Sequence, residues 1–269
     1  MPEHINPSVE AKYREGQKGK NNKGTTVIIR KYNNSSNIII EFQDEYKYQI
    51  VTTYANFLIG QMKNPYDVIA GKHGFIGVGD YKPSYKHKGI TIPEKSYQTW
   101  YKMHIRSENN CEYKPQYTDV KICEEWFNYQ NFANWYNENY YEVENDFMCL
   151  DKDIMIPNSR IYSPETCCFL PNRLNEIFHN MNKTKSNGLP TGIEYAKRKT
   201  DKDGYRVKVT YVDDNGNRRY VRKTFNELED AKKFYSWFKQ QDTRRIIESY
   251  KNILPEKIYK ALYDYNFSY

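Results

Sequence analysis

The sequence contains no long apolar run, and its cysteines show none of the spacings that bind zinc or form a redox pair. No stretch of its 269 residues approaches the roughly 18 uncharged apolar residues that a membrane-spanning helix needs. Residues 1–10 show no basic segment followed by an apolar one. The five cysteines are an odd number and include no C-x-x-C pair. We therefore expect an intracellular protein with no zinc, no disulfide scaffold and no membrane partner.

A nucleotide-binding loop is also missing. Residues 74–80 read Gly-Phe-Ile-Gly-Val-Gly-Asp, but their glycine spacing differs from the dinucleotide-binding pattern. No Lys-Ser or Lys-Thr pair follows them, and no apolar helix begins there. We therefore expect no nucleotide cofactor.

The charge is unevenly distributed along the chain. The sequence carries 41 Lys and Arg against 34 Asp and Glu, a net charge of +7. Residues 188–269 hold 18 basic and 12 acidic residues, whereas residues 95–185 hold 10 and 13. A basic C-terminal third is the electrostatic pattern of a protein that binds a phosphate backbone. The 38% of hydrophobic residues is enough to form folded cores.

Composition and length predict an α+β protein of several modules. The first module has a Gly- and Lys-rich entry, expected to be a loose arm, and then β-branched runs that predict three short strands. A segment rich in Gly, Pro and Lys follows it and has the composition of a linker. The predicted parts are residues 1–66 (basic arm and small β-rich module), 67–94 (linker), 95–187 (central part) and 188–269 (C-terminal module).

The central part begins with helical periodicity. Aromatic and apolar residues recur at spacings of three and four from Lys95 to Arg106 and from Cys123 to Tyr140, which predicts two helices. Further on, strands expected at 149–154 and 160–162 predict a β-hairpin, and a helix should begin near Pro171. Two strands and a helix are the layout of a ββα-metal nuclease, in which a divalent ion lies opposite a general base.

Several motifs in the central part resemble the His-Asn-His (HNH) endonucleases that bacteriophages encode as free-standing genes. They are W-x-x-M-x-x-R from Trp100, Y-x-D-V-x-I-C-x-E-W from Tyr117, F-x-x-W from Phe132, L-D-K-D-I from Leu150 and Y-S-P-E-T-C from Tyr162. The resemblance covers residues 95–180. It implies a homing-endonuclease-like enzyme that cleaves DNA with Mg²⁺ or Mn²⁺ as its cofactor.

The resemblance assigns roles position by position. Asp151 matches the metal-binding carboxylate, and Asn172 or Asn175 matches the second metal ligand on the helix. Lys152 stands where the family has its base histidine. A lysine accepts a proton near neutral pH only if its pKa falls by about three units. The flanking carboxylates of Asp151 and Asp153 act in the opposite direction.

This departure leaves alternatives open. Either a metal-bound hydroxide works with a different base, such as His179 or Glu165, or the site is a relic that only binds DNA. Lys152 is best interpreted as a phosphate contact if DNA is bound. Asp151 and Asp153 fit a hairpin cap equally well, and asparagine is common in the first turn of a helix.

The C-terminal module predicts a three-stranded antiparallel sheet with a helix across one face. The Asn215-Gly216 pair is a strong hairpin signal between the second and third strands. Apolar positions from Ala231 to Phe238 predict the covering helix, and those from Ile246 to Tyr259 predict more helix packing back on the module. The strands are expected at residues 192–198, 205–212 and 219–225.

Alternation along the middle strand separates an apolar face from a basic one. Val207 and Val209 point one way, whereas Arg206 and Lys208 point the other. Because the helix can cover only one face, the basic face should stay open. Its predicted members are Arg206 and Lys208, with Lys197 or Lys199 from the first strand and Arg219 or Arg222 from the third.

Motifs in this module resemble the ethylene-response-factor-type DNA-binding domain of plant transcription factors, which also occurs in phage integrases and appended to phage HNH endonucleases. They are G-I-x-Y from Gly192, K-D-G-Y-R-V-K-V from Lys202 and L-E-D-A-K-K-F-Y from Leu228. The resemblance covers residues 191 to 245 and implies a sheet that lies in the major groove of DNA. It places base and phosphate contacts on Arg198, Arg206, Lys208, Arg219 and Arg222.

The sequence therefore favours a protein that binds double-stranded DNA in a phage-infected or prophage-carrying bacterium. Metal-dependent cleavage would depend on Asp151 and the helix asparagines. One alternative is a DNA-binding regulator that does not cut. Another is a phage inhibitor that binds a host protein, since tyrosine-rich surfaces suit protein interfaces.

Overall fold

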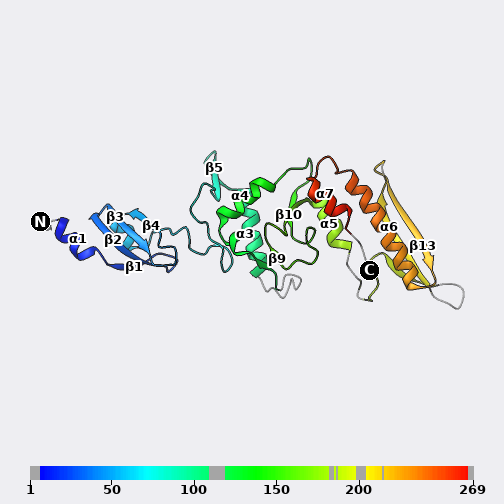
Figure 1. Ribbon diagram of the computed structural model, residues 1–269, viewed down its shortest axis with the longest axis horizontal. Coiled ribbons are helices and arrows are strands. Elements are labelled where there is room, and N and C mark those ends of the chain that lie inside the picture. Colours follow the sequence, from blue (N-terminus) through cyan, green and yellow to red (C-terminus); the bar gives the residue numbers. More distant parts are fainter. Residues whose placement is uncertain are drawn as a thin grey trace. The chain divides into compact units, whose positions relative to one another are not determined.

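A computed structural model describes residues 7–108, 119–181, 185, 187–197, 204–213 and 215–265. The chain divides into two compact units, Met1–Glu138 and Asn139–Tyr269. Both contain helices and antiparallel strands, as Figure 1 shows, so the predicted α+β class is confirmed. No helix of the described ranges is long and apolar enough to cross a membrane.

A four-stranded antiparallel sheet with the strand order β1-β2-β3-β4 opens the first unit. Its core contains β-branched and aromatic side chains, among them Val27, Ile40 and Phe42, and Phe57 from a short helix packs against them. Thr53 caps that helix by accepting a hydrogen bond from the N–H of Asn56. The elements are α1 (Pro7–Arg14), β1 (Lys18–Lys20), β2 (Thr26–Asn34), β3 (Asn37–Phe42), β4 (Gln49–Thr52) and α2 (Tyr54–Leu58).

The edge strand β1 corrects one expectation, because the Gly- and Lys-rich composition of residues 1–24 predicts a loose arm. Residues 18–20 instead pair with β2, with Lys18 opposite Ile28 and Lys20 opposite Thr26. Gly19 lies against the ring of Phe57. Pairing with a long neighbouring strand therefore orders a segment whose own composition carries no strand signal.

Helices and aromatic residues dominate the rest of the first unit. Trp100, Trp126 and Phe132 are fully buried. The carbonyl of Trp126 accepts hydrogen bonds from Trp100 Nε1 (2.7 Å) and, in one tautomer, from His104 Nε2 (3.1 Å). The elements are β5 (Ser84–His87), β6 (Ile90–Pro93), α3 (Lys95–Glu108), β7 (Lys121–Ile122), the 3₁₀ helix η2 (Glu124–Phe127) and α4 (Tyr129–Asn139), so helices lie in both predicted segments and a hairpin lies in the predicted linker.

The second unit begins with β8 (Met148–Asp151), β9 (Ile161–Tyr162), β10 (Cys168–Pro171) and α5 (Asn172–Met181). β8 pairs with β10, not with the nearer strand that the sequence suggested. All four residues of β10 are buried, so this strand has two covered faces. The chain between β8 and β9 turns at residues 152–158, because the Asp151 side chain binds the backbone there.

The C-terminal sheet agrees with the predicted sheet and helix. β11 (Ile193–Ala196), β12 (Gly204–Val212) and β13 (Arg218–Phe225) form an antiparallel sheet in that order, and α6 (Leu228–Glu248) packs along it (Figure 1). Ile193, Val207 and Val209 form a core with Ala231 and Tyr235 of α6.

The end of α6 contributes to a different core from its beginning. Ile247, together with Leu254 and with Ile258 of α7 (Glu256–Tyr263), packs with Leu170 and Leu174. The sequence predicts that residues 246–259 pack back on the C-terminal module, whereas here they also pack against residues of β10 and α5. The apolar side chains in the first half of α6 therefore pack against the three-stranded sheet, and those in its second half pack against the β8–β10–α5 region.

Candidate nucleic-acid interface

Asp151 ends β8, where its carboxylate holds a turn. Oδ1 accepts hydrogen bonds from the backbone N–H groups of Asp153 (2.8 Å) and Ile154 (2.9 Å). Burial raises the pKa of Asp151, and the two hydrogen bonds oppose that shift. One oxygen of this predicted metal ligand therefore serves the local fold.

Lys152 is 9% exposed and is engaged on both sides of the same loop. Its Nζ donates to Asp153 Oδ1 and to the carbonyl oxygen of Ser159, each at 2.7 Å. A buried ammonium with such partners is a structural cross-link, because loss of the Asp153 carboxylate would leave its charge without compensation. Lys152, which the sequence suggested at the position of a general base, thus ties the loop together.

The two asparagines lie beyond the far end of the β8–β10 ladder from Asp151. Asp151 is opposite Cys168, whereas Pro171, which precedes Asn172, is opposite Met148. These rungs are three residues apart, or about 10 Å at 3.4 Å per residue. Asn172 donates to Glu176 Oε1 (3.1 Å) and accepts from Cys149 Sγ (3.4 Å), and Asn175 lies further along α5. Within the described residues, the side chains of Asp151 and Asn172 therefore have different partners and no direct contact with each other.

The two alternative bases are exposed. Glu165 accepts a hydrogen bond from Ser163 Oγ at 2.7 Å, which lowers the pKa of Glu165. His179 is in the last turn of α5. Across the described ranges, no group of three or more His, Cys, Asp or Glu side chains is placed to hold a metal ion.

The register of the C-terminal sheet sorts its basic residues by face. Directly opposite residues in antiparallel strands share a face. Lys208 is opposite Arg222, and Arg206 is opposite Thr224. Since Val207 and Val209 between them pack against α6, these basic residues are on the side that α6 leaves open.

We call this side the C-terminal face. Its only carboxylate within the described strands is Glu194, which pairs with Arg206 at 3.3 Å. Tyr220 is 71% exposed and lies between Arg218 and Arg222 along β13. The residues of the C-terminal face are Glu194, Arg206, Lys208, Thr210, Val212, Arg218, Tyr220, Arg222 and Thr224.

Arg219 is on the covered side of the sheet. It is opposite Tyr211, whose ring contacts Phe238 of α6, and its Nε donates to Asp213 Oδ2 at 2.8 Å. That hydrogen bond is the largest cause of the lowered pKa of Asp213. Of the two third-strand arginines that the sequence offered, the register places Arg222 on the C-terminal face.

The structure adds one residue that sequence reasoning missed. This residue is Arg218, which is opposite Val212 at the end of the C-terminal face. Because every second residue of a strand shares a face, the positions of Arg222 and Tyr220 could have predicted that Arg218 lies on this face too. Lys197 is exposed just after β11. The predicted contacts Arg198 and Lys199 lie outside the described residues.

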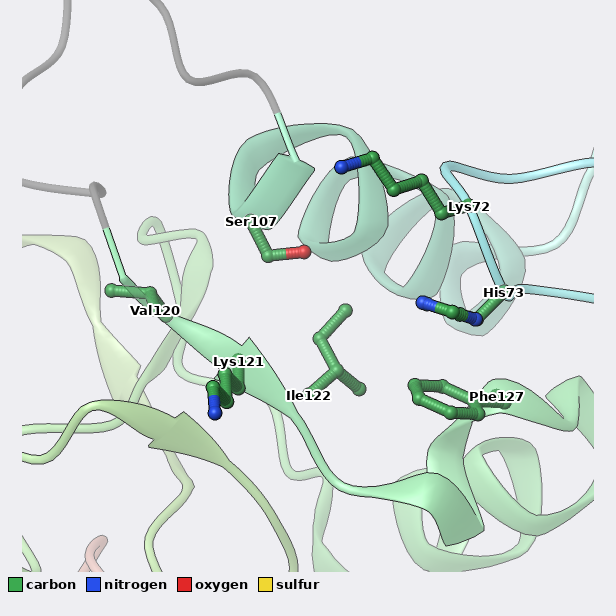
Figure 2. Close-up of a pocket in the computed structure, with 7 residues that line it drawn as sticks. All are labelled: Lys72, His73, Ser107, Val120, Lys121, Ile122 and Phe127. Carbon is green, nitrogen blue, oxygen red and sulfur yellow. The ribbon is translucent and has the colours of Figure 1, made fainter.

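A pocket of about 280 Å³ lies in the first unit between α3 and β7 (Figure 2). The ring of His73 stacks on Phe127 at 4.7 Å, and Ile122 points into the space while Lys121 points away from α3. His104, on the same helix, is fully buried, and burial lowers its pKa to about 4. None of the predicted catalytic, metal-binding or DNA-binding residues lines this pocket, although Val120 and Ile122 belong to the motif that begins at Tyr117. The pocket is bordered by Lys72, His73, Ser107, Val120, Lys121, Ile122 and Phe127.

A scan against protein-family models finds no match for this chain, and searches of curated proteins and of solved structures find none either.

Proposed function

We propose that this protein binds double-stranded DNA through the C-terminal face. One observation carries the proposal: within the described strands, four basic side chains share the uncovered side of a three-stranded sheet, and one paired carboxylate is the only acid among them. Lys208, Arg218 and Arg222 are exposed and have no ion-pair partner within the described chain. Such a surface is electrostatically complementary to a phosphate backbone.

The chemistry of the face suits the major groove. A β-ribbon fits the width of that groove, where arginine binds guanine O6 and N7 with two parallel hydrogen bonds. Three of the four basic residues are arginines, and Tyr220 and Thr210 add hydroxyl groups that can donate to phosphate. The resemblance to ethylene-response-factor-type domains leads to the same mode of binding.

The region around Asp151 supports binding without cleavage. Its carboxylate and Lys152 stabilise the loop that follows β8, and Asn172 lies past the other end of the ladder. The proposed function is therefore that of a DNA-binding regulator, and not of a nuclease that uses these residues.

The test compares two arginines of one strand. We expect Arg222→Ala to weaken binding of a short duplex about fivefold or more, since a specific arginine contact is worth about 1–3 kcal/mol. Arg219→Ala, on the covered side, should change the dissociation constant less than about twofold. Fluorescence anisotropy at several salt concentrations measures both. Equal losses for the two variants, or binding that salt does not weaken, would overturn the proposal.

A plasmid assay tests the second part of the proposal. Supercoiled DNA with Mg²⁺ or Mn²⁺ should be shifted in a gel but not nicked. Nicking that Asp151→Ala abolishes, in a variant that still shifts the DNA, would show a nuclease at this site and contradict binding without cleavage.

A further inference from the structure

The N-terminal sheet also has an open face. Val27, Ile29, Ile38 and Ile40 are buried on its covered side with Phe57, so their neighbours along the strands face the other way. Gly19 faces Phe57, which places the flanking Lys18 and Lys20 on the open side. We call this side the N-terminal face; it comprises Lys18, Lys20, Thr26, Ile28, Arg30, Lys31, Ile39, Glu41, Gln49 and Val51.

An irregularity in β2 puts two consecutive basic residues on this face. Ile29 is opposite Ile40, but the next aligned pair is Lys31 with Ile39, so Arg30 is the extra residue of a β-bulge. Lys31 shares the face of Ile39, and Arg30 reaches Glu41 on the same side at 2.6 Å. Strict alternation would have turned Lys31 into the core, whereas a bulge re-aims a side chain.

The one carboxylate of the N-terminal face is neutralised within the fold. Glu41 is 7% exposed and accepts hydrogen bonds from Arg30 (2.6 Å), Gln43 (2.9 Å) and Gln49 (2.8 Å). Together these lower the pKa of Glu41 to about 2, with the Arg30 hydrogen bond contributing most.

The three lysines of this face keep their charge available. Lys18, Lys20 and Lys31 are exposed, and none has an ion-pair partner in the described parts of the chain. The face therefore has a positive potential that its own carboxylate does not cancel.

The spacing and composition of the lysines favour a repeating polyanion over a protein partner. Lys20 and Lys18 are two residues apart along β1, or about 7 Å. On the neighbouring strand β2, Lys31 lies beyond Ile28, the residue opposite Lys18, so the three lysines follow one direction from Lys20 through Lys18 to Lys31. Protein interfaces are depleted in lysine and enriched in aromatic residues. The N-terminal face has three lysines and no aromatic residue.

We infer that the N-terminal face is a second DNA-binding surface, which contacts phosphates without reading bases. Lysine is a point charge suited to phosphate, whereas the arginine-rich C-terminal face has the paired donors that recognise guanine. The inference rests on the proposed function only in that both surfaces would bind the same DNA. Two surfaces on one chain raise the total affinity, because the second contact is intramolecular.

The experiment uses the full chain and a 40-base-pair duplex. We expect the triple variant Lys18→Gln, Lys20→Gln, Lys31→Gln to weaken binding about tenfold or more near 150 mM salt. The slope of log K against log salt should become shallower by about 2–3, since each lost phosphate contact contributes about 0.9. The loss should be equal on AT-rich and GC-rich duplexes. Arg30 is left in place, because its removal would leave Glu41 buried without its cation.

A matched control and a parallel variant separate the two proposals. Lys12→Gln is the control: this exposed lysine is on α1, whose Arg14 contacts Tyr32 and Tyr54 on the covered side. Its variant should bind as the unchanged protein does. A lysine triple variant that keeps its fold, affinity and salt slope, while Arg222→Ala loses affinity, would overturn this inference and leave the proposed function standing. The reverse pattern would overturn the proposed function alone.

Discussion

The two sheets that each leave one face uncovered have similar packing on the covered side, but they differ in how deeply the carboxylate of the open face is buried. In each, a glycine of the edge region faces an aromatic ring of the covering helix: Gly19 faces Phe57, and Gly192 faces Tyr235. Among the described strand residues, each open face has four basic side chains and one paired carboxylate. Glu41 is buried among three donors, whereas Glu194 is partly exposed and pairs with Arg206 alone.

This difference separates charges that fold the protein from charges that are free for a partner. Arg30 anchors a buried carboxylate, so the N-terminal face needs it for stability. The ion pair of Arg206 is solvent-exposed, and such pairs contribute at most about 1 kcal/mol. Substitutions on the C-terminal face should therefore alter binding with little effect on folding.

The largest loss of stability is expected at Gly192, where the ring of Tyr235 leaves no room for a side chain. A Cβ at position 192 would be 2.1 Å from Tyr235 Cε2, whereas one at position 19 would be 3.0 Å from Phe57 Cζ. Gly192→Ala should therefore destabilise its sheet by about 1–3 kcal/mol, and Gly19→Ala by less than about 1 kcal/mol. Hydrogen exchange followed by mass spectrometry reads the two sheets separately.

A double variant controls for effects unrelated to this contact. Adding Tyr235→Leu to Gly192→Ala removes the ring, so the combined loss should be smaller than the sum of the two single losses. If Gly192→Ala and Gly19→Ala reduce the hydrogen-exchange protection of their sheets by the same amount, the two glycines do not differ in how tightly the rings pack against them.

The next prediction concerns the ion pairs. Arg30→Ala should destabilise the N-terminal sheet by about 1–2 kcal/mol, because Glu41 stays buried with only the two glutamine donors. Arg206→Ala should change stability by less than about 0.5 kcal/mol, as expected for an exposed site. Urea unfolding of both variants measures this, and similar losses would show that the burial of Glu41 is not what distinguishes the sheets.

The pH dependence of the N-terminal sheet follows from the same carboxylate. The pKa of Glu41 is lowered from 4.5 to about 2, so the unfolded chain takes up its proton more readily than the folded one. The stabilisation is present above about pH 4.5 and is lost as the pH falls towards 2. Because the Arg30 side chain is 48% exposed, solvent screens its charge, and the loss should be smaller than that of Arg30→Ala. In the unchanged protein, the hydrogen-exchange protection of the N-terminal sheet should decline between pH 5 and 3, and Glu41→Gln should make this decline smaller. If the variant shows the same decline, other titratable groups cause it.

Local sequence patterns predicted the elements but not all of their partners. Spacings of three and four around Trp100 and Trp126 indicated helices, and both segments contain them. β1 was missed because its strand character comes from pairing with β2 and from the room that Gly19 leaves for Phe57. The partner of β8 was missed because the turn depends on hydrogen bonds of the Asp151 carboxylate, which no periodicity reports.

The sequence predicted part of the candidate site, namely the basic residues of the C-terminal face. Alternation in β12 placed Arg206 and Lys208 on an open face, and strand register then distinguished Arg222 from Arg219. The N-terminal face could not be found from the sequence. A β-bulge breaks the alternation at Lys31, and Glu41 looks like an ordinary surface acid until Arg30 and two glutamines enclose it.

The smallest expected effect concerns the aromatic residue that only the C-terminal face has. Tyr220→Ala should weaken DNA binding about three- to tenfold, because one hydrogen bond contributes about 0.5–1.5 kcal/mol net. Tyr220→Phe should reproduce this loss if the hydroxyl donates to a phosphate, as tyrosine often does. Tyr195 is a matched control: it is 59% exposed but opposite Tyr205, on the side that α6 covers. Anisotropy titrations that show equal losses for Tyr195→Ala and Tyr220→Ala would mean that DNA does not distinguish the two sides of this sheet.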